Sequence, residues 1–359
     1  MGLMSTLFQR KSRPLVGVDI SGSAIKLVEL TGSDENPEVV AFAVEPLPEG
    51  AIVDRQVNDA DILANALRRT LQRAGTRTQR AALAVPGASV ISKVIPMPAT
   101  LSESDMEEQI QVEADQYIPY PISEVSLDFE VIGPSATDPD AVDVLLAACR
   151  REHVEALTQV LELAGIEPAV IDAEPFALEN ACDYLRRQMA ADAHTVAVVD
   201  IGNSTTHVNV LHDGDSVFSR EHTIGGRVLT EEIARAYGME PGEAAQKKKE
   251  NDLPDDYRDT ILLPFFDEIA QQIDRSFQMF FASARVSQQI DQLLIAGGSA
   301  YLDGIVEHIG GRLQIAAERA RPLSNLRVAR GARSANLERN EAALLLALGL
   351  ASRTFDRAR

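Results

Sequence analysis

The 359-residue sequence contains no tryptophan and only two cysteines, Cys149 and Cys182. Each cysteine lies in an apolar helix or strand pattern, so two buried, reduced thiols are expected rather than a disulfide. The sequence has no Cys/His cluster of the kind that binds zinc. Its longest apolar run, Ala342 to Ala351, is too short to cross a bilayer as a helix, and residues 1–13 lack the apolar core of a signal peptide. These absences exclude a disulfide scaffold and a zinc module, and they argue against a membrane-spanning helix.

Basic residues are also scarce, with 34 Lys and Arg against 54 Asp and Glu and a formal net charge of -20. Such a surface repels phosphates, which argues against nucleic acid or an anionic membrane surface as the main partner. The composition, 45% hydrophobic and 25% charged, is that of a globular and soluble protein. The length exceeds a single ordinary core, so two or more domains are expected.

What the sequence does contain is one pattern that occurs twice. The segments are Val16 to Leu30 (VGVDISGSAIKLVEL) and Ala197 to Leu211 (AVVDIGNSTTHVNVL). In both, an apolar run ends at an aspartate, a turn of small residues follows, and a second apolar-polar run begins. Apolar runs that flank a Gly/Ser/Asn turn are typical of a β-hairpin. An internal repeat of this kind predicts two similar halves that face each other.

Turns of small residues can bind anions, because backbone N–H groups approach a phosphate closely where no large side chain intervenes. Asp19 and Asp200, which end the two buried strands, could hold Mg²⁺ directly or through water. Each aspartate could instead stabilise its own turn. Because the two are matched in position, the pair favours a magnesium-nucleotide site between the halves.

The pattern of predicted strands and helices changes within the segment between the two repeats. A predicted strand meander, Leu15 to Val44, is followed by a helix, Asp59 to Ala74, and a buried strand, Ala81 to Val85. A strand–helix–strand–strand–helix block then interrupts the first half. The predicted division is a flexible tail (1–13), first lobe core (14–88), inserted subdomain (89–165), first lobe core and connecting helix (166–194), second lobe (195–334) and closing connecting helix (335–359). The basic stretch from Arg319 to Arg333 is expected to be a solvated loop.

The order of these parts resembles the superfamily of actin, sugar kinases and chaperone ATPases. Five segments carry the resemblance: Asp19 to Ser23 with Lys26 (first phosphate loop), Glu174-Pro175 (start of the first connecting helix), Asp200 to His207 (second phosphate loop), Ala296 to Ser299 (adenosine loop) and NEAALLLALGLA (second connecting helix). The resemblance implies an α/β, actin-like ATPase fold with two similar lobes. Each lobe would have a β-meander sheet and helices, and the first would carry an inserted α+β subdomain.

The resemblance also implies a site for ATP and Mg²⁺. The metal would be held by Asp19 and Asp200, while Glu174 and His207 would orient or polarise the attacking water. Glu174 could also be an ordinary acidic helix start, and His207 a core histidine. Nucleotide contacts are implied for Ser21, Gly22, Ser23, Lys26, Gly202, Asn203, Ser204, Thr205, Gly225, Gly226, Lys248, Gly297, Gly298 and Ser299.

The sequence does not settle the roles of the lysines. Lys26 could be an exposed strand residue, and the residues alone do not decide which lysine of 247–249 reaches the nucleotide. Ser21 and Ser204 stand where many members of the superfamily have glycine, so ATP hydrolysis is expected to be weak if present.

The inserted block narrows the resemblance. Glu113 to Gly133 (EADQYIPYPISEVSLDFEVIG) and the ending ALGLASR are similar to the PilM family of type IV pilus assembly proteins, which are related to FtsA. This implies a bacterial cytoplasmic scaffold, peripheral to the inner membrane, whose nucleotide state tunes its interaction with the short cytoplasmic N-terminus of PilN. The resemblance also implies other pilus assembly proteins as partners, and it leaves self-association open.

Two alternatives remain at this stage. An FtsA-like polymer would be expected to end in a membrane-binding helix, whereas this sequence stops at SRTFDRAR. A sugar or acyl kinase needs a catalytic aspartate at an acceptor pocket, and the sequence offers no convincing candidate. For the partner, the seam between the first lobe and its insert is the expected groove, because a peptide needs apolar pockets and hydrogen-bonding edges. The helix Asp105 to Ile118 is expected to flank it, with acidic side chains that would either attract a basic peptide or form a solvated face (Glu107, Glu108, Glu113, Asp115).

Overall fold

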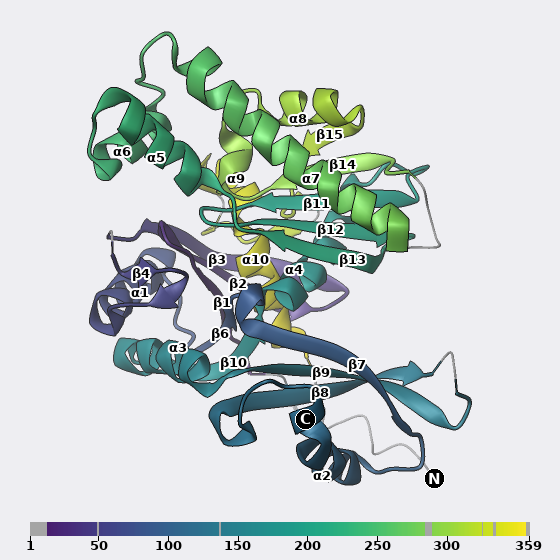
Figure 1. The fold of residues 1–359 in the computed structure, drawn as a ribbon. Coiled ribbons are helices and arrows are strands. Elements are labelled where there is room, and N and C mark those ends of the chain that lie inside the picture. Colours follow the sequence, from purple (N-terminus) through teal and green to yellow (C-terminus); the bar gives the residue numbers. More distant parts are fainter. Residues whose placement is uncertain are drawn as a thin grey trace.

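The computed structural model describes residues 13–48, 50–135, 138–283, 289–324, 326–332 and 335–356. All but the last residue of the predicted flexible tail, 1–13, therefore lies outside the described part of the chain. Two lobes lie one above the other, each built on a sheet, and two helices lie between them (Figure 1). Among the described residues, no helix is both long and apolar enough to cross a membrane.

The first lobe is built on a six-stranded sheet with the order β10-β6-β1-β2-β3-β16. Its strands are β1 (Val16–Ile20), β2 (Ala24–Ser33), β3 (Asn36–Pro46), β6 (Arg80–Val85), β10 (Glu167–Ala173) and β16 (Arg327–Val328). The first three pair antiparallel as the predicted meander, whereas β6 and β10 join in parallel. A small hairpin of β4 (Ile52–Val53) and β5 (Gln56–Val57) follows the meander. The parallel strands require crossover connections, which bring helices onto the sheet.

The second lobe repeats this arrangement in the order β13-β12-β11-β14-β15. Its strands are β11 (Thr195–Ile201), β12 (Thr206–His212), β13 (Asp215–His222), β14 (Gln292–Ala296) and β15 (Ala316–Arg319). Again the first three are antiparallel and the last two are parallel. The repeat seen at Asp19 and Asp200 therefore extends to five strands of each sheet.

Helices cover the outer face of each sheet. On the first lobe these are α1 (Ala60–Ala74) and α3 (Arg151–Ala164); on the second they are α5 (Gly226–Tyr237), α7 (Leu263–Ser283) and α8 (Ile305–Leu313), with α6 (Pro241–Glu250) against α5. The aromatic stripe of α7 was predicted to be core, and Phe266 and Phe280 are indeed fully buried. These helices complete one apolar core in each lobe.

The inner faces of the sheets are separated by α4 (Glu174–Cys182) and α10 (Leu345–Ser352). Pro175 lies in the first turn of α4, where its missing N–H removes no helical hydrogen bond. Gly349 of α10 lies so close to α4 that a Cβ atom there would be 1.8 Å from the carbonyl oxygen of Ala177. The two connecting helices therefore cross in backbone contact. A short helix, α9 (Ala335–Glu338), precedes α10.

The insert is a three-stranded antiparallel sheet in the order β7-β9-β8, with a helix on one face. It comprises β7 (Val90–Pro98), α2 (Glu103–Glu113), β8 (Val125–Pro134) and β9 (Ala141–Arg150). Ser102 and Asp105 form a capping box at the start of α2. Met106 and Ile110 of α2 are buried against this sheet.

Two segments lie elsewhere than the sequence predicted. Helix α3, assigned to the insert within 89–165, packs in the first-lobe core, because its apolar face meets α1 and β10. The basic stretch Arg319–Arg333, expected to be a solvated loop of the second lobe, contributes β16, which pairs in parallel with β3 of the first lobe. Leu323, buried beside Val28 and Leu344, anchors this crossing to the first sheet.

Candidate functional site

Polar side chains from neighbouring strands form a row at the hairpin end of each sheet. In the second sheet Asp200 of β11 pairs with His207 of β12, which in turn pairs with Glu221 of β13. In the first sheet Asp19 of β1 pairs with Lys26 of β2. Paired residues point to the same face of a sheet. Each sheet therefore presents a polar row at the place where the sequence repeat ends its first strand.

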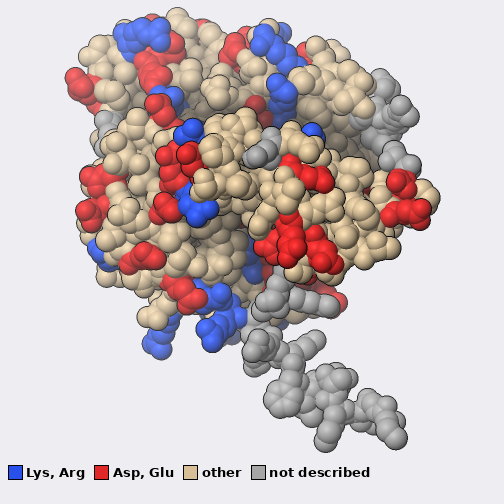
Figure 2. All heavy atoms as spheres, turned by 60° about the horizontal axis from the view of Figure 1, so that its bottom comes forward, with Lys and Arg blue, Asp and Glu red and all other residues tan. Residues whose placement is uncertain are grey.

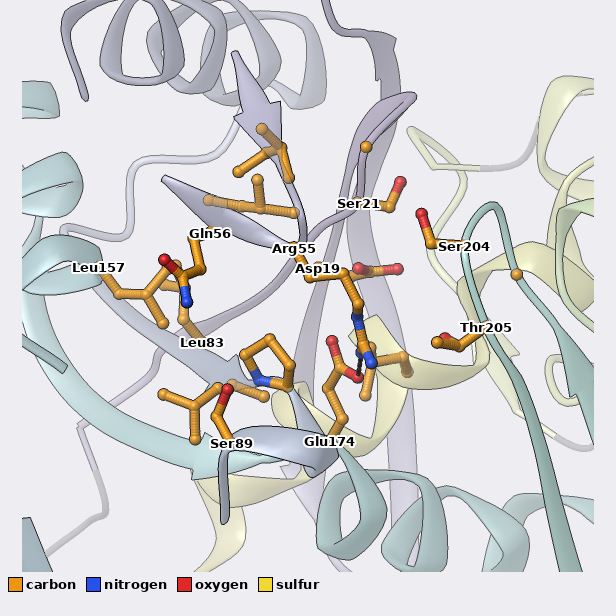
Figure 3. A pocket seen from close by; sticks show the side chains of 18 of the residues that line it. Asp19, Ser21, Arg55, Gln56, Leu83, Ser89, Leu157, Glu174, Ser204 and Thr205 are labelled. Atoms are coloured by element: carbon orange, nitrogen blue, oxygen red, sulfur yellow. Dashed lines mark hydrogen bonds and ion pairs between the residues drawn. The ribbon is translucent and has the colours of Figure 1, made fainter. Parts of the chain in front are cut away.

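A cavity of about 310 Å³ lies where these rows meet, between the lobes. In Figure 3, Asp19 and Ser21 lie on one side of it and Ser204 and Thr205 on another, while Arg55 reaches Glu174. On the first-lobe side the lining continues along apolar residues (Ile52, Leu83, Leu157). The cavity thus joins both predicted phosphate turns, both aspartates and the start of α4.

Lys26 is not an exposed strand lysine. Its Nζ donates to Asp19 Oδ2 at 2.7 Å, and only 14% of its side chain is exposed. Burial alone would lower the pKa of Lys26, but the carboxylates of Asp19, Asp200 and Glu174 outweigh it and raise that pKa. Lys26 is therefore a fixed cation at the floor of the cavity.

The donor set fits a divalent cation. Burial raises the pKa of Asp200 to about 6, against the opposing effects of Lys26 and His207. Asp19, Asp200, Glu174 and Glu221 supply four carboxylates, whereas the cationic groups beside them are Lys26, Arg55 and the His207 imidazole, whose pKa these carboxylates raise. The carboxylates therefore outnumber the cationic groups. Buried charge of one sign is costly unless it is compensated. A Mg²⁺ ion would compensate the excess of carboxylates, and Asp19 and Asp200 both line the cavity that would hold it.

Glu174 and His207 meet at the same point. His207 Nε2 lies 3.6 Å from Glu174 Oε2 and 3.5 Å from Glu221 Oε2, and it contacts Thr205 Oγ1 at 3.3 Å. Burial opposes charge on both residues, but their mutual contact and the Arg55 guanidinium lower the pKa of Glu174. Burial would likewise lower the pKa of His207, but Glu174, Glu221 and Asp200 raise it. An ionised carboxylate beside an imidazole is able to orient a water molecule.

The two turns approach each other across the cavity. A Cβ atom on Gly22 would be 2.9 Å from Asn203 Nδ2. Ser21 closes its own turn, since its hydroxyl donates to the Ala24 carbonyl at 2.9 Å. Ser23 is exposed and is not part of the cavity lining. Of the first turn, Ser21 and Gly22 thus reach the cavity.

Four further predicted residues gather around Gly202, which itself lines the cavity (Gly225, Gly226, Lys248 and Ser299). The Gly202 carbonyl accepts from Gly226 N at 2.9 Å and from Ser299 Oγ at 3.4 Å. A Cβ atom on Gly225 would be 2.6 Å from the same carbonyl oxygen. Lys248 Nζ donates to the Gly226 carbonyl at 2.8 Å, and burial lowers the pKa of Lys248 to about 8. Within the run 247–249, Lys248 is therefore the residue joined to this cluster.

The sequence analysis missed two residues of this site: Arg55, which lines the cavity, and Glu221, which contacts Arg55 and His207. Arg55, on the turn between β4 and β5, donates to both Glu174 and Glu221. No pattern in the sequence marks Arg55. Glu221 could have been found from the hairpin register, but only with a one-residue bulge between Val210 and Leu211 taken into account. Without that shift Arg220 would lie opposite His207.

Comparison with known proteins agrees with this architecture. A family model described as "Type IV pilus assembly protein PilM" matches residues 17–355. The solved structure of a PilM-PilN type IV pilus biogenesis complex superposes with a TM-score of 0.80 at 29% identity, covering 95% of this chain and 98% of that chain. The ethanolamine utilization protein EutJ from Carboxydothermus hydrogenoformans has a TM-score of 0.53 at 19% identity, with 94% of this chain and 89% of that chain covered.

A diol dehydratase-reactivating factor in nucleotide-free form has a TM-score of 0.54 at 10% identity, with coverage of 94% of this chain and 99% of that chain. At such identities the last two likenesses show the fold alone. The predicted actin-like fold with two similar lobes and an inserted subdomain is confirmed. Because the family model matches nearly the whole chain, this protein belongs to the PilM family of type IV pilus assembly proteins.

Proposed function

We propose that this protein is a cytoplasmic, ATP-binding scaffold of type IV pilus assembly, peripheral to the inner membrane, that binds the N-terminal peptide of PilN. Membership of the PilM family and the likeness to a PilM-PilN complex support this role. The observation that carries the nucleotide assignment is the approach of the two matched turns, at Gly22 and Asn203, across a cavity that both aspartates line. Family membership does not favour the FtsA-like polymer or the kinase.

In this proposal the nucleotide phosphates lie between the two turns. Backbone N–H groups near Gly22 and Asn203 would bind phosphate oxygens, and Lys26 would neutralise part of their charge. The adenosine would lie near Gly297 and Gly298. Asp19 and Asp200 would hold Mg²⁺, which when bound supplies charge neutralisation and orientation of the phosphates.

The proposed role of Glu174 follows from its position at the start of α4, facing the cavity. Its carboxylate is ionised and held by His207 and Arg55, so it would orient a water molecule toward the terminal phosphate. The Ser21 hydroxyl donates to the Ala24 carbonyl within its own turn. Slow turnover remains our expectation for a scaffold of this kind.

Glu174→Gln is expected to slow ATP hydrolysis by at least about tenfold while ATP affinity changes little, because an amide orients water less well than a carboxylate. Phosphate release measured at saturating ATP, together with calorimetry of ATP binding, tests this. Glu179→Gln is the matched control, since Glu179 is exposed on the same helix and does not line the cavity. Equal turnover in the two variants would remove Glu174 from the mechanism.

The groove that suits a peptide lies between the insert and the first lobe. A depression of about 890 Å³ is lined by β8 and β9 of the insert, by β10, and by residues of the C-terminal segment such as Arg353. In the described part of the chain, β8 and β10 are edge strands of their sheets. Edge strands offer unpaired N–H and C=O groups to which an extended peptide can add. We therefore assign the PilN peptide to this groove.

The groove lies on the opposite side of the insert sheet from α2. Val144 and Leu146 of β9 pack against α2, whereas Leu145, Ala147 and Cys149, which alternate with them, line the groove. The helix expected to flank the groove does not line it, so Glu107, Glu108 and Glu113 are not groove residues. The side chain of Asp115 lies outside the described part of the structure. Figure 2 shows the underside of the molecule, where acidic side chains gather in patches between broad uncharged areas.

Ala147→Arg is expected to weaken binding of a PilN N-terminal peptide by at least about tenfold, because the new side chain would fill the groove that the peptide must enter. Ala147 is half-buried on the groove face of β9. Fluorescence anisotropy of a labelled synthetic peptide, titrated with the full-length protein, measures the effect.

Val112→Arg is the matched control, because Val112 is 81% exposed on α2, on the far side of the same sheet. It should bind the peptide as the wild type does. Both variants should keep the wild-type melting temperature and ATP affinity. Undiminished binding by a folded Ala147→Arg protein would place the peptide elsewhere.

A further inference from the structure

The β4–β5 hairpin carries one arginine into the cleft from the first lobe. Its turn residues, Asp54 and Arg55, have φ angles of 48° and 64°, the left-handed conformation of a tight two-residue hairpin. The hairpin is anchored at its base, where the amides of Asn58 and Asp59 donate to the Ala51 carbonyl. Ile52 and Val57 pack against the first-lobe core. The position of Arg55 is thus fixed to the first lobe.

The partners of Arg55 belong to two other parts of the molecule. One nitrogen of its guanidinium donates to Glu221 Oε1 of β13, in the second lobe, at 2.5 Å. The other nitrogen donates to Glu174 at the start of α4, between the lobes. Only 20% of the Arg55 side chain and 15% of each glutamate side chain are exposed. A single guanidinium therefore joins the first lobe, the connecting helix and the second lobe.

Glu221 reaches this position because of the bulge in the β12–β13 hairpin. The one-residue shift between Val210 and Leu211 places Glu221, rather than Arg220, opposite His207. The second oxygen, Glu221 Oε2, is buried and accepts no hydrogen bond from the described residues, although His207 Nε2 lies 3.5 Å from it. With Arg55 removed, two carboxylates would face each other across the His207 ring with no permanent cation between them. The arrangement therefore depends on Arg55.

We infer that Arg55 is a positioning residue that ties the Glu174 carboxylate to closure of the cleft by bridging Glu174 and Glu221. The inference rests on the proposed function in taking the cleft as the nucleotide site. A guanidinium can hold two carboxylates at once only while all three groups stay within hydrogen-bond reach. When the lobes separate, Arg55 loses Glu221, and Glu174 loses the restraint that Glu221 exerts through the guanidinium. The orientation of Glu174 then follows the angle between the lobes.

The test measures the distance between the lobes directly. Spin labels are placed on the exposed positions Arg69→Cys of α1 and Ala236→Cys of α5, in a full-length chain that also carries Cys149→Ser. Pulsed electron spin resonance is recorded with and without magnesium and a non-hydrolysable ATP analogue. Without nucleotide, Arg55→Ala should shift the distribution to longer distances and broaden it. With the analogue, the same variant should fail to reach the wild-type closed distance.

Three further variants separate positioning from a general loss of stability. Arg73→Ala removes an ion pair with Glu45 inside the first lobe and should leave the distribution unchanged. The swap Arg55→Glu with Glu221→Arg should restore the wild-type distance, because Arg at 221 can reach both Glu174 and the new carboxylate. Arg55→Lys should restore it only in part, since an ammonium lacks the two-pronged geometry. In parallel, Arg55→Ala should lower the turnover of ATP at least about tenfold while the Kd for ATP changes less than about threefold.

An unchanged distance in Arg55→Ala would overturn the inference, and so would a swap that fails to restore the distance in a protein with wild-type melting temperature. The nucleotide-free distances do not depend on the ATP assignment. If no ATP analogue binds even to the wild type, the proposed function fails while the bridge is still tested by those distances. Normal ATP binding with unchanged distances rejects the bridge and leaves the proposed function standing.

Discussion

Replacing Gly349 by alanine is expected to destabilise the folded protein by about 3 kcal/mol, toward the upper end of what overpacking costs. The new Cβ atom would lie 1.8 Å from the carbonyl oxygen of Ala177 and 3.1 Å from the Cβ of Ala181. The clashing oxygen belongs to the α4 backbone, so it cannot turn away as a side chain could. On its other side α10 is held by β1, where a Cβ on Gly17 would lie 2.1 Å from the Ala347 carbonyl oxygen. Relief therefore requires α4 and α10 to separate.

The matched control is Gly311→Ala in α8, where a Cβ atom would meet nothing within 4 Å. In a helix with open space around it, alanine is favoured over glycine by about 1 kcal/mol. The same substitution should thus raise the melting temperature at position 311 and lower it by several degrees at position 349. Differential scanning calorimetry of both variants decides this. A wild-type melting temperature for Gly349→Ala would mean that α4 and α10 do not cross in backbone contact.

A second consequence of Gly349→Ala concerns the site, because Glu174 is the first residue of α4. If α4 is pushed away from α10, the Glu174 carboxylate moves with it relative to His207 and Arg55. The variant is therefore expected to lose ATP turnover in excess of its loss of folded protein. The crossing of the connecting helices and the geometry of the proposed site depend on the same glycine.

The sequence predicted the central strands well because their signal is local. Strands β1 and β11 are continuous apolar runs ended by a polar residue and a small-residue turn, and both sheets bury them on two faces. Asp19 and Asp200 follow directly, since each stands at the same place in a repeated hairpin. Glu174 was predicted from the resemblance of Glu174-Pro175 to the start of a connecting helix, and Pro175 lies in the first turn of α4. In each case the deciding residues lie within a few positions of one another.

The residues that were missed depend on contacts between distant segments. Arg55 lies on a hairpin of two-residue strands, and its partners Glu174 and Glu221 are far from it in sequence. The β16 pairing joins residues 327–328 to β3, which lies near the start of the chain. The sequence also could not predict which face of the insert sheet α2 covers, because β9 is apolar on both faces. That double apolar pattern is accounted for by α2 on one face and the groove on the other.

Gly298→Val is expected to abolish ATP binding, or to weaken it by more than about tenfold, without loss of stability. A Cβ atom at Gly298 would meet nothing within 4 Å, and its φ angle is not in the left-handed region, so the protein itself has room for a side chain. Its neighbour differs, because Gly297 has a φ of 87° and a Cβ there would lie 2.3 Å from the Ile201 carbonyl oxygen. Gly297→Val would deform the turn, whereas valine at 298 would project into the space proposed for the adenosine.

Calorimetric titration with Mg-ATP measures the effect, and thermal unfolding without nucleotide confirms that the variant is folded. Gly331→Val is the matched control, since Gly331 is exposed and also has nothing within 4 Å of its Cβ position, but it lies outside the cluster around Gly202. It should bind ATP as the wild type does. If nucleotide state tunes binding of the PilN peptide, a variant that cannot bind ATP must bind the peptide equally well with and without ATP. We therefore expect ATP to leave the peptide affinity of Gly298→Val unchanged and to change that of Gly331→Val as it does in the wild type. Equal ATP affinity in the two variants would reject the assignment of residues 296–299 as the adenosine loop.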